Sequence, residues 1–337
     1  MQKVKKVLLL GGGGYIGPIV AQRLLEYGYH VTIFDNLIYQ QYQSTSFLFQ
    51  HENFGFINGD LRDDAAVIKA YQGIDKLVIL GGLVGDPITK KYPDESNAIN
   101  VLGIQKSIDA ISGTGINHVL FISTCSNYGL MPEGEIATEE SPLKPMSLYA
   151  EAKVQAENYL LQKKGNVDYS ATVLRFATAF GLSPRMRFDL TINEFTREIF
   201  LGNELVVYDA DTWRPYCHVK DFARLIETVL SSDPNLSSFE IFNAGGDENN
   251  RTKRALVQNI TDQMPNAKIS YKDHGVDPRN YKVDFDKVKR VLGFKPEYSI
   301  DYGIKEVINA LRAGIFADFT QRKNFYGNYK LLNHKNF

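Results

Sequence analysis

The stretch Val7–Gly17, VLLLGGGGYIG, decides the fold of this 337-residue chain. Its first four residues are apolar, and a continuous apolar run of this length suits a strand that is covered on both faces. Four glycines follow at once, and the segment Ile19–Tyr27 then has the spacing of an amphipathic helix. The stretch therefore predicts a strand, a tight turn and a helix, which is the unit that parallel sheets are built from.

The same alternation continues along the chain. Short apolar runs predict further strands at Val31–Phe34, Phe54–Ile57, Leu77–Leu80 and Val119–Ile122. We also interpret Ala171–Leu174 and Glu240–Asn243 as strands that return to the same sheet. Amphipathic segments predict helices at Ala65–Tyr71, Ile99–Ile111 and Tyr149–Lys163. Strands that alternate with helices indicate an α/β fold with a doubly wound parallel sheet.

The composition excludes several classes of protein. The chain is 44% hydrophobic and 23% charged, as in ordinary soluble enzymes, and its net charge of −1 gives no field for binding nucleic acid. No stretch approaches the roughly 18 apolar residues of a membrane span. Cys125 and Cys217 provide neither a disulfide framework nor a zinc site. We therefore expect a cytoplasmic protein without a metal, a nucleic-acid partner or a membrane partner.

The glycines after the first predicted strand form a G-x-x-G-x-x-G pattern at Gly11, Gly14 and Gly17. Glycine at these places allows a tight turn and a close approach of the backbone to a diphosphate. The N-terminus of the following helix adds unpaired N–H groups and a dipole that favours the same anion. We therefore predict a dinucleotide site in this turn, with contacts from these glycines and from Tyr15 and Ile16.

Acidic residues end the next two predicted strands. Asp35 lies eighteen residues after Gly17, where a carboxylate can accept hydrogen bonds from both adenosine ribose hydroxyls and repel a 2′-phosphate. This position, with Asn36 beside it, favours NAD over NADP, and the alternative is a turn or cap residue. Asp60 and Leu61 follow the third strand and are placed to touch the adenine. The alternative for Asp60 is the N-cap of the next helix.

Tyr149 and Lys153 are four residues apart on a predicted helix, so both side chains emerge on one face. A lysine ammonium near a phenol favours phenolate and lowers the pKa of the tyrosine. Such a tyrosine can take a proton from a sugar hydroxyl while hydride leaves the attached carbon. The strand before this helix ends in the hydroxyl residues Ser123 and Thr124. The alternative is an ordinary surface pair on a helix.

Several motifs together identify a family. They are GGGGYIG at Gly11–Gly17, FDNL at Phe34–Leu37, GDLRD at Gly59–Asp63, NVLG at Asn100–Gly103, FISTCSNYG at Phe121–Gly129, SLYAEAK at Ser147–Lys153, RPYCHVKD at Arg214–Asp221 and VLGFKP at Val291–Pro296. The chain resembles an extended short-chain dehydrogenase/reductase of the NAD-dependent nucleotide-sugar epimerase/dehydratase family, such as the UDP-galactose 4-epimerase-like proteins. The resemblance runs from residue 4 to about residue 312. It implies an NAD-dependent enzyme acting on a nucleoside-diphosphate sugar, with a role in polysaccharide biosynthesis.

The resemblance implies a catalytic triad of Thr124, Tyr149 and Lys153. Thr124 would hydrogen-bond the reacting hydroxyl and Tyr149 would act as acid and base. Lys153 would bind the nicotinamide ribose and tune Tyr149. The family also implies contacts to the substrate diphosphate from Arg214 and Arg279.

Other positions bear on the substrate. Arg185 and Arg187 fall in the family's substrate loop, and we interpret them as phosphate or sugar contacts, with solvated surface charges as the alternative. Thr178 stands where the family usually has an asparagine that contacts the substrate diphosphate, and we keep it as a candidate substrate contact. The segment Gly81–Leu83 replaces a small-Ala-Ala segment, which implies a reshaped pocket on the nicotinamide side.

The residues after Thr124 bear on the reaction. Sugar 4,6-dehydratases of this family carry Asp-Glu there as an extra acid and base, whereas this chain has Cys125 and Ser126. The resemblance therefore implies oxidation at sugar C4 by NAD, most simply in a 4-epimerase. A nucleotide-sugar 4-dehydrogenase or reductase and an atypical dehydratase are alternatives. The Cys125 thiol is a second candidate for proton transfer, although a cysteine at a strand end is more often a small buried hydrophobe.

A non-catalytic NAD-binding regulator is the alternative from another class of protein. The pair of Tyr149 and Lys153 argues against this alternative, because a pure sensor has no use for a tuned phenol. In either case we expect an NAD-binding Rossmann domain at residues 1–175, to which a strand near 240–243 returns. A smaller substrate domain with exchanged segments would occupy residues 176–315, followed by a C-terminal tail at 316–337.

The resemblance also implies a homodimer. In this family, a pair of helices corresponding to Ile99–Ile111 and Tyr149–Lys163 builds a four-helix bundle between subunits. Leu148, Ala152 and Ala156 lie four residues apart and form a stripe of mostly small side chains. We expect this stripe to make the close helix contact.

Overall fold

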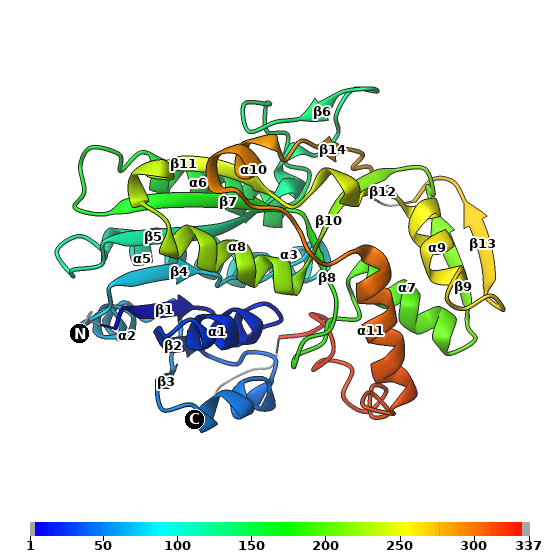
Figure 1. The fold of residues 1–337 in the computed structure, drawn as a ribbon, viewed down its shortest axis with the longest axis horizontal. Helices are drawn as coiled ribbons and strands as arrows, with labels where there is room; N and C mark the ends of the chain where they lie inside the picture. The colour runs from blue at the N-terminus through cyan, green and yellow to red at the C-terminus, as the bar shows by residue number, and fades with distance from the viewer. Residues whose placement is uncertain (1–3, 276, 332–337) are drawn as a thin grey trace.

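A sheet of seven parallel strands lies at the centre of the computed structural model, which describes residues 4–275 and 277–331. The strand order is β11-β7-β5-β4-β1-β2-β3. The strands are β1 (Lys6–Leu10), β2 (His30–Asp35), β3 (Phe54–Asn58), β4 (Lys76–Ile79), β5 (His118–Thr124), β7 (Ser170–Phe176) and β11 (Glu240–Ala244). Helices lie on both faces of this sheet (Figure 1). The doubly wound parallel sheet expected from the alternation of strands and helices is therefore confirmed.

The apolar run of β1 is explained by cover on both faces. One face packs against α1 (Gly17–Glu26) and α8 (Val219–Ser231), and the other against α2 (Asp64–Ala70), α5 (Ile104–Asp109) and α6 (Leu148–Leu161). Val7 and Leu9 belong to the first layer. Leu8 and Leu10 belong to the second layer. Because successive strand residues point to opposite faces, a strand between two layers of helices needs apolar residues at every position.

The strand order places a crevice between β1 and β4. The chain runs outward from β1 to β2 and β3, and it then crosses back to place β4 on the other side of β1. The turns that leave β1 and β4 therefore diverge above the carboxyl end of the sheet. Ligands of open parallel sheets bind at this kind of reversal.

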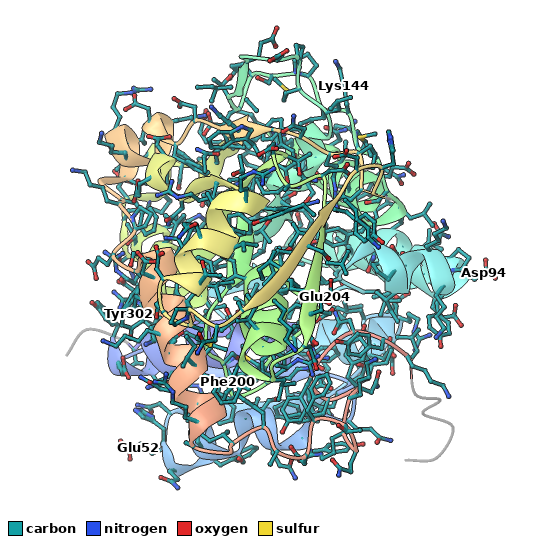
Figure 2. The ribbon with its side chains drawn as sticks, turned by 90° about the vertical axis from the view of Figure 1, so that its right-hand side faces the viewer. Glu52, Asp94, Lys144, Phe200, Glu204 and Tyr302 are labelled. Carbon is teal, nitrogen blue, oxygen red and sulfur yellow. The ribbon has the colours of Figure 1, made fainter. Side chains whose placement is uncertain are left out.

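A second lobe lies beside the carboxyl end of the sheet. Its elements are α7 (Thr191–Phe200), α9 (Lys253–Thr261), α11 (Ile300–Arg312), the pair β9 (Glu204–Tyr208) and β13 (Lys268–Lys272), and the small sheet of β8 (Thr178–Phe180), β10 (Trp213–His218) and β12 (Asn250–Thr252). Figure 2 turns this lobe toward the viewer, with Phe200, Glu204 and Tyr302 marking α7, β9 and α11. Apolar residues of α7, α9 and α11 form its own core.

Shorter elements complete the chain. They are α3 (Asp86–Lys91), α4 (Pro93–Ser96), the π-helical stretch η2 (Asn97–Gly103), α10 (Asp286–Leu292), the paired strands β6 (Ile136–Ala137) and β14 (Lys282–Val283), and the 3₁₀ turns η1 (Tyr42–Gln50), η3 (Cys125–Tyr128), η4 (Pro234–Leu236) and η5 (Asp247–Asn249). The helix expected at residues 99–111 is thus a π-helical stretch continued by α5. No helix in the described part of the chain is long and apolar enough to cross a bilayer.

The chain passes between the two lobes more than once. After β8 and β10 in the second lobe, α8 and β11 return to the first layer of helices and to the sheet beside β7. We therefore propose a division in which residues 1–175 form the NAD-binding domain and 176–315 the substrate domain, with α8, β11 and α10 as the exchanged segments.

The described part of the tail, residues 316–331, forms a C-terminal strap between the lobes (Figure 1, red). Phe316, Phe325 and Tyr326 pack in one apolar cluster with Met186 and Phe188 of the second lobe. The N–H of Phe188 also donates to the backbone oxygen of Tyr326 at 2.8 Å. The strap therefore covers the molecule's own interior.

Candidate active site

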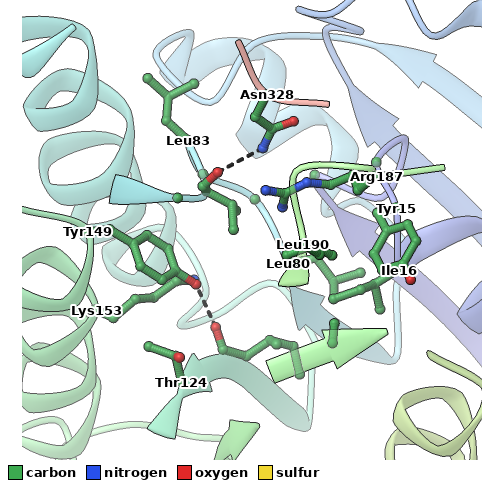
Figure 3. Close-up of a pocket in the computed structure, with 18 of the residues that line it drawn as sticks. Tyr15, Ile16, Leu80, Leu83, Thr124, Tyr149, Lys153, Arg187, Leu190 and Asn328 are labelled. Atoms are coloured by element: carbon green, nitrogen blue, oxygen red, sulfur yellow. Dashed lines mark hydrogen bonds between the residues drawn. The ribbon is translucent and has the colours of Figure 1, made fainter. Parts of the chain in front are cut away.

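One pocket opens at the carboxyl ends of β1, β4 and β5, between the sheet, the second lobe and the C-terminal strap (Figure 3). All the site residues expected from the sequence line it: Gly11, Gly14, Tyr15, Ile16, Gly17, Asp35, Asn36, Asp60, Leu61, Thr124, Tyr149, Lys153, Thr178, Arg185, Arg187, Arg214 and Arg279. The fold thus brings into one cavity residues that are spread over more than two-thirds of the sequence.

The glycine turn has the shape that a dinucleotide requires. Gly11 has a φ of 81°, and a Cβ there would lie 2.1 Å from the Cα of Gly81. A Cβ at Gly17 would lie 2.0 Å from the backbone oxygen of Gly12. A Cβ at Gly14 would meet nothing within 4 Å, so the backbone there borders open space in the pocket. Two of the glycines are therefore needed for the turn itself, and the third leaves room for a ligand above the N-terminus of α1.

Asp35 has the expected role in the turn and also lines the pocket. Its Oδ2 accepts from the N–H of Gly13 at 2.8 Å, and its Oδ1 accepts from the N–H of Leu37 at 2.7 Å. Burial raises the pKa of the carboxyl, although these two donors oppose the rise. The side chain thus stabilises the turn and still lines the pocket, where its remaining lone pairs fit ribose hydroxyls.

Asp60 is held by its neighbours in the pocket wall. Its carboxylate accepts from Arg62 Nη2 at 2.6 Å and from Asn36 Nδ2 at 2.9 Å. Burial opposes ionisation, but these hydrogen bonds lower the pKa of Asp60 overall. The alternative role as a helix cap is wrong, because Asp63 caps α2 by accepting from the N–H of Ala66 at 3.1 Å.

The Tyr15 phenol does not face the cofactor turn. Its hydroxyl donates to the backbone oxygen of Gly181 at 2.5 Å and accepts from Asn193 Nδ2 at 3.1 Å. The side chain is 5% exposed and packs in the cluster that includes the strap. The phenol therefore ties the glycine turn to the second lobe, and a contact between Tyr15 and the cofactor would come from its backbone.

The catalytic candidates converge on one wall of the pocket (Figure 3). β5 ends at Thr124, and α6 presents Tyr149 and Lys153 one turn apart. Lys153 Nζ donates to the backbone oxygen of Ile122 at 2.8 Å, and Thr124 Oγ1 accepts from the N–H of Ser126 at 3.1 Å. β5 thus fixes both the hydroxyl of Thr124 and the ammonium of Lys153 in the wall that also contains the Tyr149 phenol.

Burial dominates the ionisation of this wall. It raises the pKa of the Tyr149 phenol, while Arg187 lowers that pKa and Asp86 raises it further. Burial also lowers the pKa of Lys153 to about 8, against the opposing effect of Glu157. The direction for Tyr149 is opposite to the one expected from Lys153 alone. Desolvation disfavours phenolate more than the protein's own cations favour it.

A buried ion pair lies behind the catalytic wall. Glu157, one turn beyond Lys153, accepts from Arg175 Nη2 at 2.7 Å and from Asn127 Nδ2 at 2.8 Å. The hydroxyl of Ser123, the residue before Thr124, donates to the same carboxylate. Glu157 and Arg175 are 0% and 3% exposed. This pair therefore joins α6 to β5 and β7 at the level of the candidate catalytic residues.

The Cys125 thiol is turned away from the pocket. It donates to the backbone oxygen of Arg175 at 3.0 Å, is 1% exposed, and belongs to the core cluster of the sheet. Burial raises the pKa of the thiol well above its usual value. The alternative role in proton transfer is therefore not supported, and Ser126 is the neighbour that lines the pocket.

Arginines paired with carboxylates line another part of the pocket. Asp277 accepts from Arg214 Nη2 at 3.0 Å and from Arg279 Nε at 2.7 Å. Arg279 also lies 2.9 Å from Asp86 Oδ2. Two guanidinium groups thus share one aspartate, which leaves donors free for an anionic ligand.

The substrate-loop arginines are buried. Arg185 is 2% exposed and Arg187 is 6% exposed, so their interpretation as solvated surface charges is wrong. Arg187 makes a two-bond pair with Asp189, at 3.0 and 2.6 Å. Thr178 lies at the start of β8 and lines the same region.

Some pocket residues were missed in the sequence. Leu80 follows β4, and its place after a parallel strand next to the crevice could have marked it as a pocket residue, as Gly81–Leu83 beside it were marked. Tyr39 and Asn328 also line the pocket, but no local sequence pattern distinguishes them.

Among the described residues, no group of three His, Cys, Asp or Glu side chains is arranged to hold a metal.

Comparisons with known proteins agree with this geometry. The model of the NAD dependent epimerase/dehydratase family matches residues 7–245. The chain is 26% identical over 311 residues to a UDP-glucose 4-epimerase of Corynebacterium glutamicum, which covers 87% of this chain and 92% of the relative. It is 27% identical over 317 residues to a UDP-glucuronate 4-epimerase of Thermodesulfobacterium geofontis, with 90% and 94% covered.

Relatives with another reaction and solved structures are also similar. The chain is 26% identical over 327 residues to UDP-glucuronic acid decarboxylase 1 of Xenopus tropicalis, covering 91% of this chain and 72% of the relative. One similar solved structure is the UDP-glucuronic acid 4-epimerase of Bacillus cereus in complex with UDP-glucuronic acid and NAD. It aligns with a TM-score of 0.83 and 22% sequence identity, and the alignment covers 91% of this chain and 99% of that chain. This likeness shows a shared fold. On the match of the family model over most of its length, the chain belongs to the NAD-dependent epimerase/dehydratase family, whose enzymes use NAD.

Proposed function

We propose that this protein is an NAD-dependent nucleotide-sugar 4-epimerase. The observation that carries the proposal is the convergence of Thr124, Tyr149 and Lys153 on one wall of a pocket that also contains the glycine turn. Bound NAD supplies the hydride acceptor for the sugar carbon. The similarity to two 4-epimerases, of UDP-glucose and of UDP-glucuronate, supports the proposal.

The residues of the catalytic wall handle the proton. Thr124 orients the C4 hydroxyl of the sugar, and Tyr149 removes its proton as the carbon is oxidised. Lys153, held by the backbone oxygen of Ile122, keeps a positive charge near the phenol and favours phenolate. After the 4-keto sugar turns over in the pocket, its carbonyl is reduced on the other face and Tyr149 returns the proton.

The arginine pairs bind the rest of the substrate. Arg214 and Arg279 hold the diphosphate, because both present donors toward the pocket from one shared aspartate, Asp277. Thr178 and Arg187 border the sugar. The substrate class that fits this set is a nucleoside-diphosphate hexose.

The alternatives differ in the step after oxidation at C4. A usual 4,6-dehydratase is disfavoured, because Cys125 faces the core and Ser126 carries no carboxylate. A 4-dehydrogenase or reductase would release the keto sugar. The similarity to a UDP-glucuronic acid decarboxylase favours a second candidate, in which a uronic acid loses CO₂ after the same oxidation. A non-catalytic regulator would not need Tyr149 and Lys153 in the same pocket wall.

The experiment that tests these candidates is product analysis. Purified protein with NAD is mixed with UDP-glucose, UDP-galactose, UDP-glucuronate and the corresponding dTDP and GDP sugars. An epimer without net NADH is the expected result. Stoichiometric NADH identifies a dehydrogenase, and a pentose with CO₂ identifies a decarboxylase. Tight NAD binding without turnover of any sugar contradicts the proposal and supports the regulator.

We also propose a homodimer through η2, α5 and α6. Its contact residues differ from the stripe that was expected from the sequence. Ala152 and Ala156 are 5% and 1% exposed and pack within the subunit, so they are wrong as contact residues. Each four-residue step advances about 40° around a helix, and Ala156 therefore lies about 80° from Leu148. Leu148 and Leu102, at 44% and 49% exposed, are the apolar residues left for a partner.

The mass in solution tests the dimer. At micromolar concentration the protein should have twice the mass of one chain, and Leu102→Glu with Leu148→Glu should halve it. Leu236→Glu, at an equally exposed leucine on η4, is the matched control. A single-chain mass for the unmodified protein contradicts the proposal.

We also propose a cytoplasmic location, because free buried cysteines are typical of a reducing compartment. A role in polysaccharide biosynthesis is proposed as well.

A further inference from the structure

Arg185 differs from the other arginines of the pocket. Each of Arg187, Arg214 and Arg279 contacts a carboxylate, whereas no ion pair to Arg185 occurs in the described part of the chain. Its Nη2 donates to the backbone oxygen of Gly327 at 3.1 Å and to Asn328 Oδ1 at 2.8 Å. Its Nε is buried and has no partner among the described residues. A guanidinium that is 2% exposed and lacks an anion is costly, unless a ligand supplies the anion.

A second unpartnered group lies against it. The Arg185 guanidinium stacks over the ring of Tyr39 at 4.6 Å, and the Tyr39 hydroxyl is also buried without a hydrogen-bond partner among the described residues. Both residues line the pocket. Tyr39 is turned inward by a loop in which Leu37 and Gln40 adopt positive φ values of 51° and 57°, a strained conformation for residues other than glycine. Two buried donors therefore face the pocket together.

These two donors lie at the cofactor end of the pocket. The loop of Tyr39 is joined to the glycine turn, since Ser44 Oγ donates to the backbone oxygen of Gly13 at 3.0 Å. Asp35, whose carboxylate binds the N–H of Gly13, is among the charges that act on both Arg185 and Tyr39. The arginines proposed for the substrate are instead grouped around Asp277.

The C-terminal strap holds this arrangement in place. Asn328 Nδ2 donates to the backbone oxygen of Val84, beyond β4, at 2.8 Å (Figure 3). Its Oδ1 accepts from Arg185, and its backbone N–H donates to Asp189 at 3.2 Å. One asparagine thus connects the wall after β4 with the second lobe across the mouth of the pocket.

We propose that Arg185 and Tyr39, fixed by the C-terminal strap through Asn328, bind the diphosphate of NAD and retain the cofactor between turnovers. The guanidinium supplies the positive charge and the phenol a neutral donor, while the glycine turn supplies backbone N–H groups from the other side. This assignment replaces the sequence-based interpretation of Arg185 as a substrate contact. It rests on the use of NAD by the proposed epimerase, but it does not depend on which sugar is the substrate.

The test measures retention of NAD without any sugar. Radiolabelled NAD is exchanged out of the purified holoprotein, and its dissociation rate and Kd are compared among variants. Arg185→Met should weaken NAD binding by about 10- to 100-fold, since a hydrogen bond to a charged group is lost. Tyr39→Phe and Asn328→Ala should each weaken it by about 3- to 10-fold. Arg254→Met, at an exposed arginine that pairs with Asp211, is the matched control and should leave the rate unchanged.

Two further measurements keep the outcomes distinct. Binding of uridine diphosphate, and of NADP, is measured for the same variants. If Arg185→Met weakens only uridine diphosphate binding, the charge serves the sugar nucleotide, and if it weakens only NADP binding, the charge serves a 2′-phosphate. Either result overturns the proposal, as does unchanged NAD binding in Tyr39→Phe. Should Arg185→Met fail to fold, judged by circular dichroism, Tyr39→Phe and Asn328→Ala decide the matter alone.

Discussion

Two walls of the pocket are built on opposite principles. The catalytic wall takes Thr124, Tyr149 and Lys153 from the end of β5 and the first turns of α6, within thirty residues of sequence. Its charges are few, and Lys153 is held by a backbone oxygen rather than a carboxylate. The charged wall takes arginines and aspartates from separate segments of both lobes: Asp86 at the start of α3, Arg214 in β10, and Arg187, Asp189, Asp277 and Arg279 in loops.

The difference between the walls is one of electrostatics. In the catalytic wall, burial outweighs the opposing charges, so that it lowers the pKa of Lys153 to about 8 and raises that of Tyr149. In the charged wall, contact with arginines holds the pKa of Asp277 low, despite burial. Shifted ionisation is typical of groups that move protons, whereas compensated charge is typical of groups that bind an anion. Substitutions in and around the two walls should therefore differ in size and in kind of effect.

The largest expected effect is on the proton-transfer group. Tyr149→Phe should lower the turnover rate about 10²- to 10⁴-fold, the usual worth of general acid–base catalysis, because the proposed acid and base is removed. NAD binding, measured separately, should be unchanged. The measurement is the rate of NAD reduction in a single turnover with substrate. A rate equal to that of the unmodified protein would remove Tyr149 from the mechanism.

The next effect is on the support of the catalytic wall. Glu157→Gln leaves the Arg175 guanidinium buried without its anion, so the free energy of unfolding should fall by about 3–5 kcal/mol. Asp211→Asn breaks an exposed pair with Arg254 and should leave the free energy of unfolding almost unchanged. Urea denaturation measures both. Equal effects of the two changes would mean that burial of the first pair has no energetic consequence.

A third effect concerns the buried lysine. Because its pKa is about 8, Lys153 should lose its proton and kcat/KM should fall as the pH rises through this value. Lys153→Met should lower activity about 10- to 100-fold and move the pH optimum upward, since the phenol then ionises later.

Lys153 also gives a signature in stability. Its pKa in the folded protein is below the value of about 10.4 in an unfolded chain, so the charged side chain opposes folding below about pH 8. This cost fades as the pH rises to about 10.4. The unmodified protein should therefore gain stability relative to Lys153→Met between pH 7 and pH 10, in urea denaturation at each pH. A constant difference would contradict the shifted pKa.

The smallest effect is expected at the cofactor's ribose. Asp35→Ala should weaken NAD binding by about 10-fold and reduce discrimination against NADP, because a carboxylate that repels the 2′-phosphate is removed. Calorimetric titration with both cofactors measures the change. Tighter binding of NADP than of NAD by the unmodified protein would show that Asp35 does not set the preference.

The sequence could predict strands and candidate residues wherever the apolar run or the residue spacing lies within a single strand or helix. The apolar runs predicted β1 to β5 of the large sheet, and the four-residue spacing of Tyr149 and Lys153 predicted that both share a face of α6. The same four-residue spacing gave a wrong prediction for Ala156, which was expected to contact a partner subunit. Spacing shows which residues share a helix face, but it does not show whether that face packs on the subunit's own core or on a partner. The alternative role of Asp60 as a cap failed for a similar reason, since several acidic residues precede α2. Asp63, three residues on, has the geometry that the helix requires.

The sequence by itself determined local features: the apolar strands, the glycine turn after β1, and the placement of Thr124 at the end of β5 and of Tyr149 and Lys153 on one face of α6. Only the tertiary structure decided that the Cys125 thiol enters the core and that Arg185 meets Asn328, 143 residues further along the chain. The physical reason is the range of the forces involved. Backbone geometry fixes neighbours within an element, whereas burial and charge compensation depend on which distant segments arrive beside a side chain.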